Sequence, residues 1–152
     1  MDMDTFHAGA WQISLPADWV ACVQPEGGEF AFESADGAKG LSIGTWQLEA
    51  GAGRTARAVA ESFRTTNLAS LGAMAGYDWE ILVDEVVDLG PLSIALSDAW
   101  ARAQSYRIIG VVLSRPPLAV RATFHDYYCQ NIDASRAYFA AIVESLQLRE
   151  PD

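Results

Sequence analysis

Hydrophobic and polar residues alternate along most of this chain with the period of a β-strand. Trp11, Ile13 and Leu15 alternate with polar residues up to Pro16, which cannot donate to a sheet ladder, so a strand should end there. Similar alternation predicts further strands at 29–34, 40–46, 79–89, 92–103, 106–113 and 118–127, and the short segment 19–23 can continue the sheet after the first strand. The pattern therefore predicts an antiparallel sheet of six to seven strands.

Two segments carry apolar residues at helical spacing instead. In residues 55–71 the apolar positions recur every three to five residues, and Thr55 is a suitable N-cap. A second helix should begin at Asn131 or Asp133 and run to about Leu148, because its apolar residues form a broad stripe. These two helices should pack on the sheet, which gives an α+β fold.

The length and composition are those of one globular domain. The chain has 152 residues, of which 51% are hydrophobic and 20% charged, and it can bury a core without disulfides or metals. Because no repeat or linker divides it, residues 1–152 should form a single domain. No apolar run approaches the roughly 20 residues that cross a bilayer, and Met1–Asp4 does not resemble a signal peptide. A cytoplasmic protein is the expectation; Cys22 and Cys129 should then be buried thiols, although they could pair.

Acidic residues outnumber basic residues two to one. Twenty Asp and Glu against ten Lys and Arg give a net charge of −10, which repels nucleic acids and anionic membranes and attracts basic partners. In the alternative interpretation, the acidic residues have no partner and only keep the domain in solution.

Several acids lie close in sequence to tryptophans, as in binding hot spots, where an aromatic anchor sits beside charges that match the partner. The predicted partner surface consists of Asp78, Trp79, Glu80, Asp84, Asp88, Asp98 and Trp100. Four of its acids form a row that should fall largely on one side of a strand: Asp78, Glu80, Asp84 and Asp88. The alternative interpretation places both Trp side chains in the core and the acids on a solvated sheet edge.

Residues with catalytic or metal-binding chemistry are few. His125 and Cys129 are the closest base and nucleophile, but positions four apart on a strand are separated by roughly 13 Å, beyond hydrogen-bond reach. His7 and His125 lack the spacing of a zinc site, and Asp84 and Glu85 should face opposite sides of a strand rather than one cation. We therefore expect no enzyme, no metal and no cofactor. A small-ligand binder or enzyme that uses His125 and Cys129 stays open as an alternative.

Two short motifs and the order of the elements resemble the PsbP-like superfamily. The first motif is ISLPADW at 13–19, and the second is IVESL at 142–146, at the end of the last helix. The resemblance implies an α/β sandwich in which helices pack on an antiparallel sheet. It also implies a domain that holds other proteins and has no shared catalytic apparatus. Members include photosystem accessory proteins, a yeast Ran-binding import factor and the Eag chaperones of type VI secretion.

The chain also resembles, in type and charge, the small acidic immunity proteins of bacterial toxin systems. The first hypothesis is therefore a non-enzymatic protein-binding domain, an immunity protein of the type VI secretion type that occludes a basic toxin. The second is an Eag-like chaperone for a secreted effector, whose hydrophobic groove shields an apolar helix of its cargo. In both hypotheses the partner is a protein, and the oligomeric state stays open.

Overall fold

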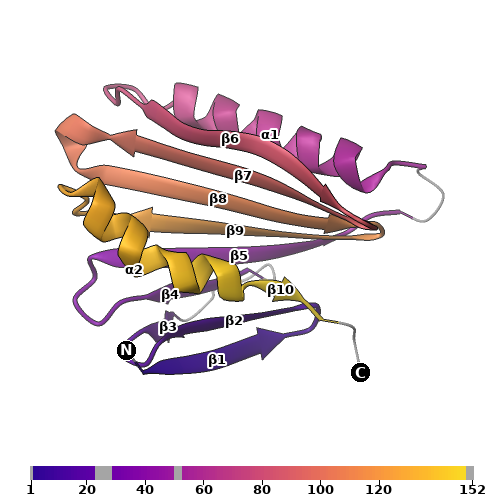
Figure 1. Cartoon of the computed structure of the whole chain (residues 1–152), viewed down its shortest axis with the longest axis horizontal. Coiled ribbons are helices and arrows are strands. Elements are labelled where there is room, and N and C mark those ends of the chain that lie inside the picture. The colour runs from indigo at the N-terminus through magenta and orange to yellow at the C-terminus, as the bar shows by residue number, and fades with distance from the viewer. Residues whose placement is uncertain (1, 23–28, 50–52, 150–152) are drawn as a thin grey trace.

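The computed structural model describes residues 2–22, 29–49 and 53–149, and it contains two antiparallel sheets and two α-helices (Figure 1). The large sheet has the order β3-β4-β5-β9-β8-β7-β6, and the small one the order β1-β2-β10. The strands are β1 (Met3–Ala8), β2 (Trp11–Pro16), β3 (Val20–Cys22), β4 (Phe30–Glu33), β5 (Lys39–Gln47), β6 (Glu80–Leu89), β7 (Leu92–Ala101), β8 (Tyr106–Arg115), β9 (Leu118–Asp126) and β10 (Gln147–Leu148). The helices are α1 (Ala56–Gly72), α2 (Ile132–Ser145) and a 3₁₀ turn at Arg102–Gln104.

The two helices pack against opposite faces of the large sheet. On one face, the Trp46 ring of β5 meets Phe63 of α1 edge-on, with ring centroids 5.1 Å apart. On the other, Phe124 of β9 meets Phe139 of α2 with centroids 6.1 Å apart. We call these the α1 face and the α2 face. Because successive strand residues point to opposite faces, Ser97 lies on the α1 face and its neighbour Asp98 on the α2 face.

The main core lies on the α2 face, beneath α2 and the small sheet. Trp11, Ile13 and Leu15 of β2 are no more than 2% exposed and pack with Phe139 and Ile142 of α2. A smaller apolar cluster under α1 joins Ala60, Ala95 and Val112. Within the described residues, neither helix is long and apolar enough to cross a membrane.

The expected α+β fold, an antiparallel sheet with two helices on it, is confirmed. The first strand, Met3–Ala8, was missed because its acidic and polar residues hide the alternation. The second helix ends at Ser145 rather than near Leu148, because Leu146 is extended (φ −70°, ψ 125°) and the next two residues pair with β2. Position 23 of one predicted strand lies outside the described residues.

The cysteines are both free. The alternative of a disulfide between them is therefore wrong. Cys129 is buried as expected, whereas Cys22 is only half-buried.

Candidate functional site

A buried polar network joins α2 to three central strands. Arg107 of β8 donates from Nε and Nη2 to the two carboxylate oxygens of Asp98 on β7, at 2.9 and 2.7 Å. Its Nη1 donates to Ser135 of α2 at 2.8 Å, and the Ser135 hydroxyl donates to Asp126 of β9 at 2.8 Å. The side chains of Arg107 and Asp98 are only 5% and 9% exposed. Buried charges require such pairing, so this network fixes the position of α2 on the sheet.

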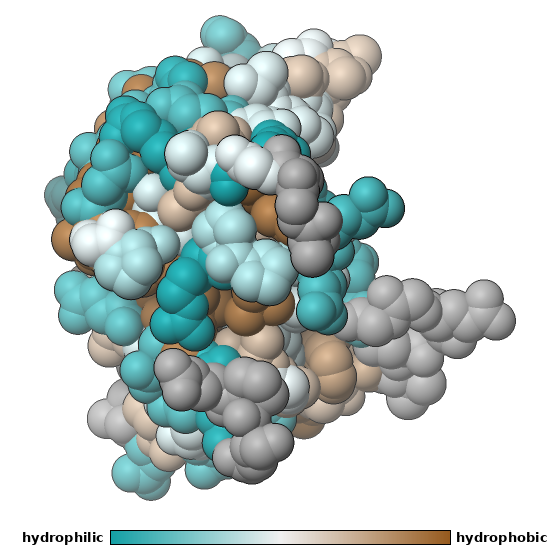
Figure 2. All heavy atoms as spheres, turned by 90° about the vertical axis from the view of Figure 1, so that its right-hand side faces the viewer, coloured by the Kyte–Doolittle hydropathy of each residue, from teal (hydrophilic) through white to brown (hydrophobic). Residues whose placement is uncertain are grey.

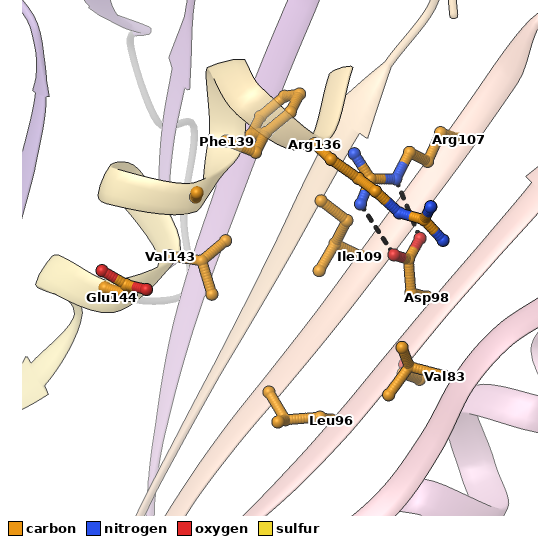
Figure 3. A pocket seen from close by; sticks show the side chains of 11 residues that line it. Val83, Leu96, Asp98, Arg107, Ile109, Arg136, Phe139, Val143 and Glu144 are labelled. Atoms are coloured by element: carbon orange, nitrogen blue, oxygen red, sulfur yellow. Dashed lines mark hydrogen bonds and ion pairs between the residues drawn. The ribbon is translucent and has the colours of Figure 1, made fainter. Parts of the chain in front are cut away.

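An apolar groove opens beside the network, between α2 and strands β6–β8, and encloses about 310 Å³ (Figure 3). Apolar side chains line both sides of it: Val83, Leu96 and Ile109 from the strands, and Phe139, Ala140 and Val143 from α2. We call this space the α2 groove. Figure 3 shows the Asp98–Arg107 pair at one end, with the Arg136 side chain extending toward it from α2. The groove therefore combines apolar walls with a charged end.

Apolar surface continues from the α2 groove along β6 and β7 toward their turn. Leu92 and Ile94 of β7 are half-buried, and their cross-strand neighbours Leu89 and Val87 are 55% and 36% exposed. Figure 2 views the end of the molecule where this turn lies, and hydrophobic surface reaches solvent there between polar patches. The large sheet therefore exposes an apolar strip that α2 does not cover.

Carboxylates border the groove on both sides. Glu144 of α2 lines it directly. Glu85 of β6 pairs with Leu96, so the two share a face, and Glu85 is exposed there. A ligand in the groove would meet an apolar floor with Glu144 along one wall, Arg136 at the charged end and Glu85 just outside the lining.

Four residues of the predicted partner surface surround one open hollow elsewhere. Asp78, Trp79, Glu80 and Trp100 line a space of about 390 Å³ together with Arg102, and we call it the Arg102 hollow. The Arg102 guanidinium carbon lies 4.6 Å from the centroid of the Trp100 ring, and Nη2 lies 3.4 Å from Glu80 Oε2. The sequence pattern thus brought together residues that are neighbours in space.

Asp84 and Asp88 lie apart from that hollow, on the α1 face of β6. Arg64 of α1 donates through two nitrogens to Asp84, and Arg57 Nη1 lies 2.9 Å from Asp88 Oδ2. The Arg64 hydrogen bond lowers the pKa of Asp84; the pKa of Asp88 is lowered by its bonds from Ser93 and Arg57. These carboxylates hold α1 onto the edge strand.

The expectation that Glu80 lies on the same side of the strand as Asp84 and Asp88 is wrong. A β-bulge between Ile81 and Val83 shifts the register, so Glu80 pairs with Trp100 and Asp84 with Ser97, on opposite faces. The predicted surface positions of Asp98 and Trp100 are also wrong. Asp98 is 7% exposed and paired with Arg107, and Trp100 is 6% exposed and donates its indole N–H to the Cys129 carbonyl, as the alternative interpretation places it. Partner binding by these residues stays a prediction.

His125 and Cys129 lie on opposite faces of the sheet. His125 Nδ1 is 2.6 Å from the Tyr106 hydroxyl on the α1 face; burial lowers the pKa of His125 and raises that of Tyr106 to about 12. The Cys129 thiol is buried beside Ser135 on the α2 face, and burial raises its pKa. A protonated thiol on the far side of the sheet from the imidazole is not a nucleophile–base pair. Within the described residues no three metal-binding side chains cluster.

Two features of the structure were not predicted from the sequence. The groove residues Val83, Leu96 and Ile109 have the alternation of ordinary core residues, so nothing in the pattern separates them from the core. A stack of aromatic rings also crosses the α1 face, with neighbouring centroids 5.4 to 6.0 Å apart. Its members are Tyr77, Trp79, Tyr106, His125 and Tyr127. The aromatic residues near the strand ends were the sequence signal for this stack. Each was assigned to its own strand, so their proximity across strands was not predicted.

No family model matches the sequence, and no curated protein matches it. Among solved structures, the chain is similar to the solution structure of cyanobacterial PsbP (CyanoP) from Synechocystis sp. PCC 6803, with a TM-score of 0.66 and 14% identity over 97% of this chain and 92% of that one. It is also similar to a 1.50 Å crystal structure from Bacteroides thetaiotaomicron VPI-5482, with a TM-score of 0.60 and 14% identity. That match covers 99% of this chain and 50% of the other, so this chain spans about half its length. The likeness confirms the PsbP-like fold, whereas the resemblance to Eag chaperones and immunity proteins stays a prediction.

Proposed function

We propose that this PsbP-like domain is a non-enzymatic protein-binding module that holds an apolar helix of a partner protein in the α2 groove. The observation that carries the proposal is the apolar lining of that groove and its continuation along β6 and β7. This occupant is the one expected under the chaperone hypothesis, in which an apolar helix of the cargo is shielded from water.

The size of the apolar strip fits a short helix. From Asp98 to Leu92, β7 spans about 20 Å at roughly 3.4 Å per residue. An α-helix covers that length in about 13 residues, or between three and four turns. Such a helix lying beside α2 would cover Leu89 and Val87, whose exposure is otherwise unexplained by the fold.

A helix fits this region better than an added strand. An added strand would pair with β6, the edge of the large sheet. Charged residues protect that edge, since Asp84 and Asp88 lie along it and bind Arg64 and Arg57 of α1. A partner that rests on the face of the sheet leaves these ion pairs intact.

The charge of the domain favours basic residues beside the partner's apolar segment. Glu144 lines the groove opposite the charged end that holds Arg136, Glu85 lies beside Leu96 on the same face, and the net charge of −10 attracts cations at long range. We therefore propose an apolar helix flanked by Lys or Arg. Burial of its apolar face would supply most of the affinity, and the charges would mainly speed association.

A lysine-flanked Leu/Ala helical peptide labelled with a fluorophore tests this proposal, with binding followed by anisotropy at low and high salt. Ala140→Trp is the main variant, because Ala140 is exposed and lines the groove, so a large ring there should block it without disturbing the core. Val20→Trp is the matched control, since it adds the same ring without a charge, and Val20 is 53% exposed on β3 and does not line the groove. We expect Ala140→Trp to weaken binding at least about tenfold, which corresponds to the loss of roughly one buried apolar side chain.

Binding should persist at high salt, with a slower association rate. Equal affinity for the wild type and Ala140→Trp would refute the placement of the helix in the groove. Complete loss of binding in high salt would refute the apolar origin of the affinity.

A second candidate function is the immunity hypothesis, now confined to the Arg102 hollow. Arg102 stacks on Trp100 and reaches Glu80, which is the arrangement that a cation from a basic toxin would adopt on displacing it. A short peptide with spaced arginines, compared with its citrulline analogue, tests this by NMR of the Trp79 and Trp100 indole signals. Arginine-specific shifts that Glu80→Gln abolishes would support it, and equal shifts with citrulline would count against it.

A further inference from the structure

The Arg102 hollow already holds a cation that belongs to the chain itself. Arg102 follows β7 directly, in the 3₁₀ turn Arg102–Gln104, and its side chain folds back over Trp100, two residues earlier. The guanidinium carbon lies 4.6 Å from the centroid of the Trp100 ring, and Nη2 lies 3.4 Å from Glu80 Oε2. The chemistry that this hollow accommodates is therefore visible: a planar cation between an indole ring and a carboxylate.

Arg102 is held in the hollow only weakly. Its side chain is 72% exposed and that of Glu80 is 54% exposed, and the 3.4 Å contact is longer than an ordinary hydrogen bond. Exposed ion pairs and exposed cation–π contacts each add little stability. Departure of the guanidinium would uncover the Trp100 ring, which is 6% exposed while Arg102 covers it.

The hollow offers more than Arg102 uses. Asp78 lines it with an exposed carboxylate that forms no hydrogen bond or ion pair with a described residue. Trp79 adds a second indole to the lining. About 390 Å³ is open with the Arg102 side chain in place, so a second side chain has room to enter.

A hydrogen bond joins the two walls of the hollow. Gln104 Nε2, from the turn after β7, donates to the Gly76 carbonyl at 2.8 Å, two residues before Asp78. This bond does not involve the Arg102 side chain, so the wall that carries Asp78 and Trp79 keeps its position when Arg102 moves. The site is thus built before a ligand arrives, which lowers the cost of binding.

We infer that the Arg102 hollow is a guanidinium site, and that Arg102 fills it as an internal competitor until an arginine side chain of a partner protein takes its place. The incoming guanidinium stacks on Trp100 and pairs with Glu80 as Arg102 does, and it also pairs with Asp78. The net charge of −10 attracts such a partner. The inference rests on the second candidate function for the kind of partner, and it is independent of the α2 groove.

Internal competition lowers the apparent affinity by the fraction of molecules in which the hollow is vacant. Contacts as weak as those of Arg102 leave it vacant in roughly one molecule in three to one in ten. Arg102→Ala should therefore strengthen binding of an arginine side chain about threefold to tenfold. A residue that only added to the binding surface would have the opposite effect.

A titration of the ¹⁵N-labelled protein with N-acetyl-arginine amide tests the inference, with the Trp79 and Trp100 indole signals followed by NMR at constant pH and ionic strength. N-acetyl-citrulline amide is the uncharged analogue, and N-acetyl-lysine amide is a cation without the planar group. We expect saturable shifts with the arginine probe, weaker binding of the lysine probe and none of the citrulline probe. The gain in Arg102→Ala should appear for the arginine probe.

Arg115→Ala is the matched control, because it removes the same charge at the far end of β8 and does not line the hollow. Its affinity should equal that of the wild type, and the spectrum of each variant shows whether it is folded. An equal gain in both variants would trace the effect to net charge and overturn the competition. Unchanged or weaker binding by Arg102→Ala would also overturn it, while the second candidate function would stand. Absence of arginine-specific shifts in all three proteins would overturn the site and the second candidate function together.

Discussion

Removal of Asp98 should destabilise the domain by a large and calculable amount. The change Asp98→Ala removes two hydrogen bonds to Arg107, of 2.9 and 2.7 Å, and leaves a guanidinium that is 5% exposed without its main partner. Breaking a buried ion pair by removing one member costs about 3–5 kcal/mol. The bond from Arg107 to Ser135, and through it the nearby Asp126, remains, so we expect a loss near the lower end, about 3 kcal/mol.

Urea denaturation at neutral pH, followed by tryptophan fluorescence, measures this loss as a change in the free energy of unfolding. The double variant Asp98→Leu/Arg107→Met should recover much of the stability, because no unpaired guanidinium is left and the buried Asp126 keeps its hydrogen bond from Ser135. The exposed pair of Arg102 and Glu80, with side chains 72% and 54% exposed, is the matched comparison, and Arg102→Ala should cost less than about 1 kcal/mol.

The losses of stability in Asp98→Ala, in the double variant and in Arg102→Ala together test the role of the buried ion pair. If Asp98→Ala costs no more than the exposed pair, the Arg107 guanidinium must reach solvent and the network does not fix α2. If the double variant is as unstable as the single one, the loss comes from packing and not from an unpaired charge.

Three further predictions concern the α1 face and its helix. Burial lowers the pKa of His125 below its ordinary 6.5. As the pH falls below that value, the unfolded chain binds more protons than the folded one, so the free energy of unfolding declines. His125→Gln should remove this part of the pH dependence in urea titrations. Gly110→Ala should cost about 1–3 kcal/mol through overpacking against Ser97 Oγ, and Ser97→Ala in the same chain should relieve most of it; no loss in the single variant would contradict the close approach. Thr55→Ala should cost about 1 kcal/mol, since Thr55 accepts the Ala58 N–H at the start of α1, whereas Thr55→Ser should be nearly neutral.

Much of the fold could be predicted because its periodicities are regular. The strand from Leu118 alternates cleanly, and both helices have capping residues, Thr55 and Asn131, at the positions where the helices begin. The failures occur where tertiary contacts override the local pattern. The second helix ends at Ser145 because the following residues pair with β2, and the Ser145 hydroxyl accepts the Ser14 N–H there; these contacts span more than 130 residues, and no local signal encodes them.

The candidate sites were predicted less well, for two physical reasons. A single β-bulge reverses the face of every residue after it, and the acidic row depended on the face of Asp84 and Asp88. Burial of a charge also depends on a partner that is distant in sequence or on another strand, as for Asp98 and Arg107. The hollow around Trp79 and Trp100 could be predicted because its residues come from two neighbouring strands and their ends, and Glu80 is the cross-strand partner of Trp100.

The small sheet has a consequence for the order in which the chain can fold during synthesis. Its second strand pairs with β10, and Arg149 N–H donates to the Ala10 carbonyl at 2.6 Å. The apolar residues of β2 are therefore made early, yet the helix and strand that cover them emerge more than 100 residues later, after a delay on the order of ten seconds at ordinary rates of translation. Throughout that interval Trp11 and its neighbours are the kind of exposed apolar segment to which nascent-chain chaperones bind. Completion of the core thus waits until α2 and β10 have been made, so the N-terminal strands cannot be covered as they emerge.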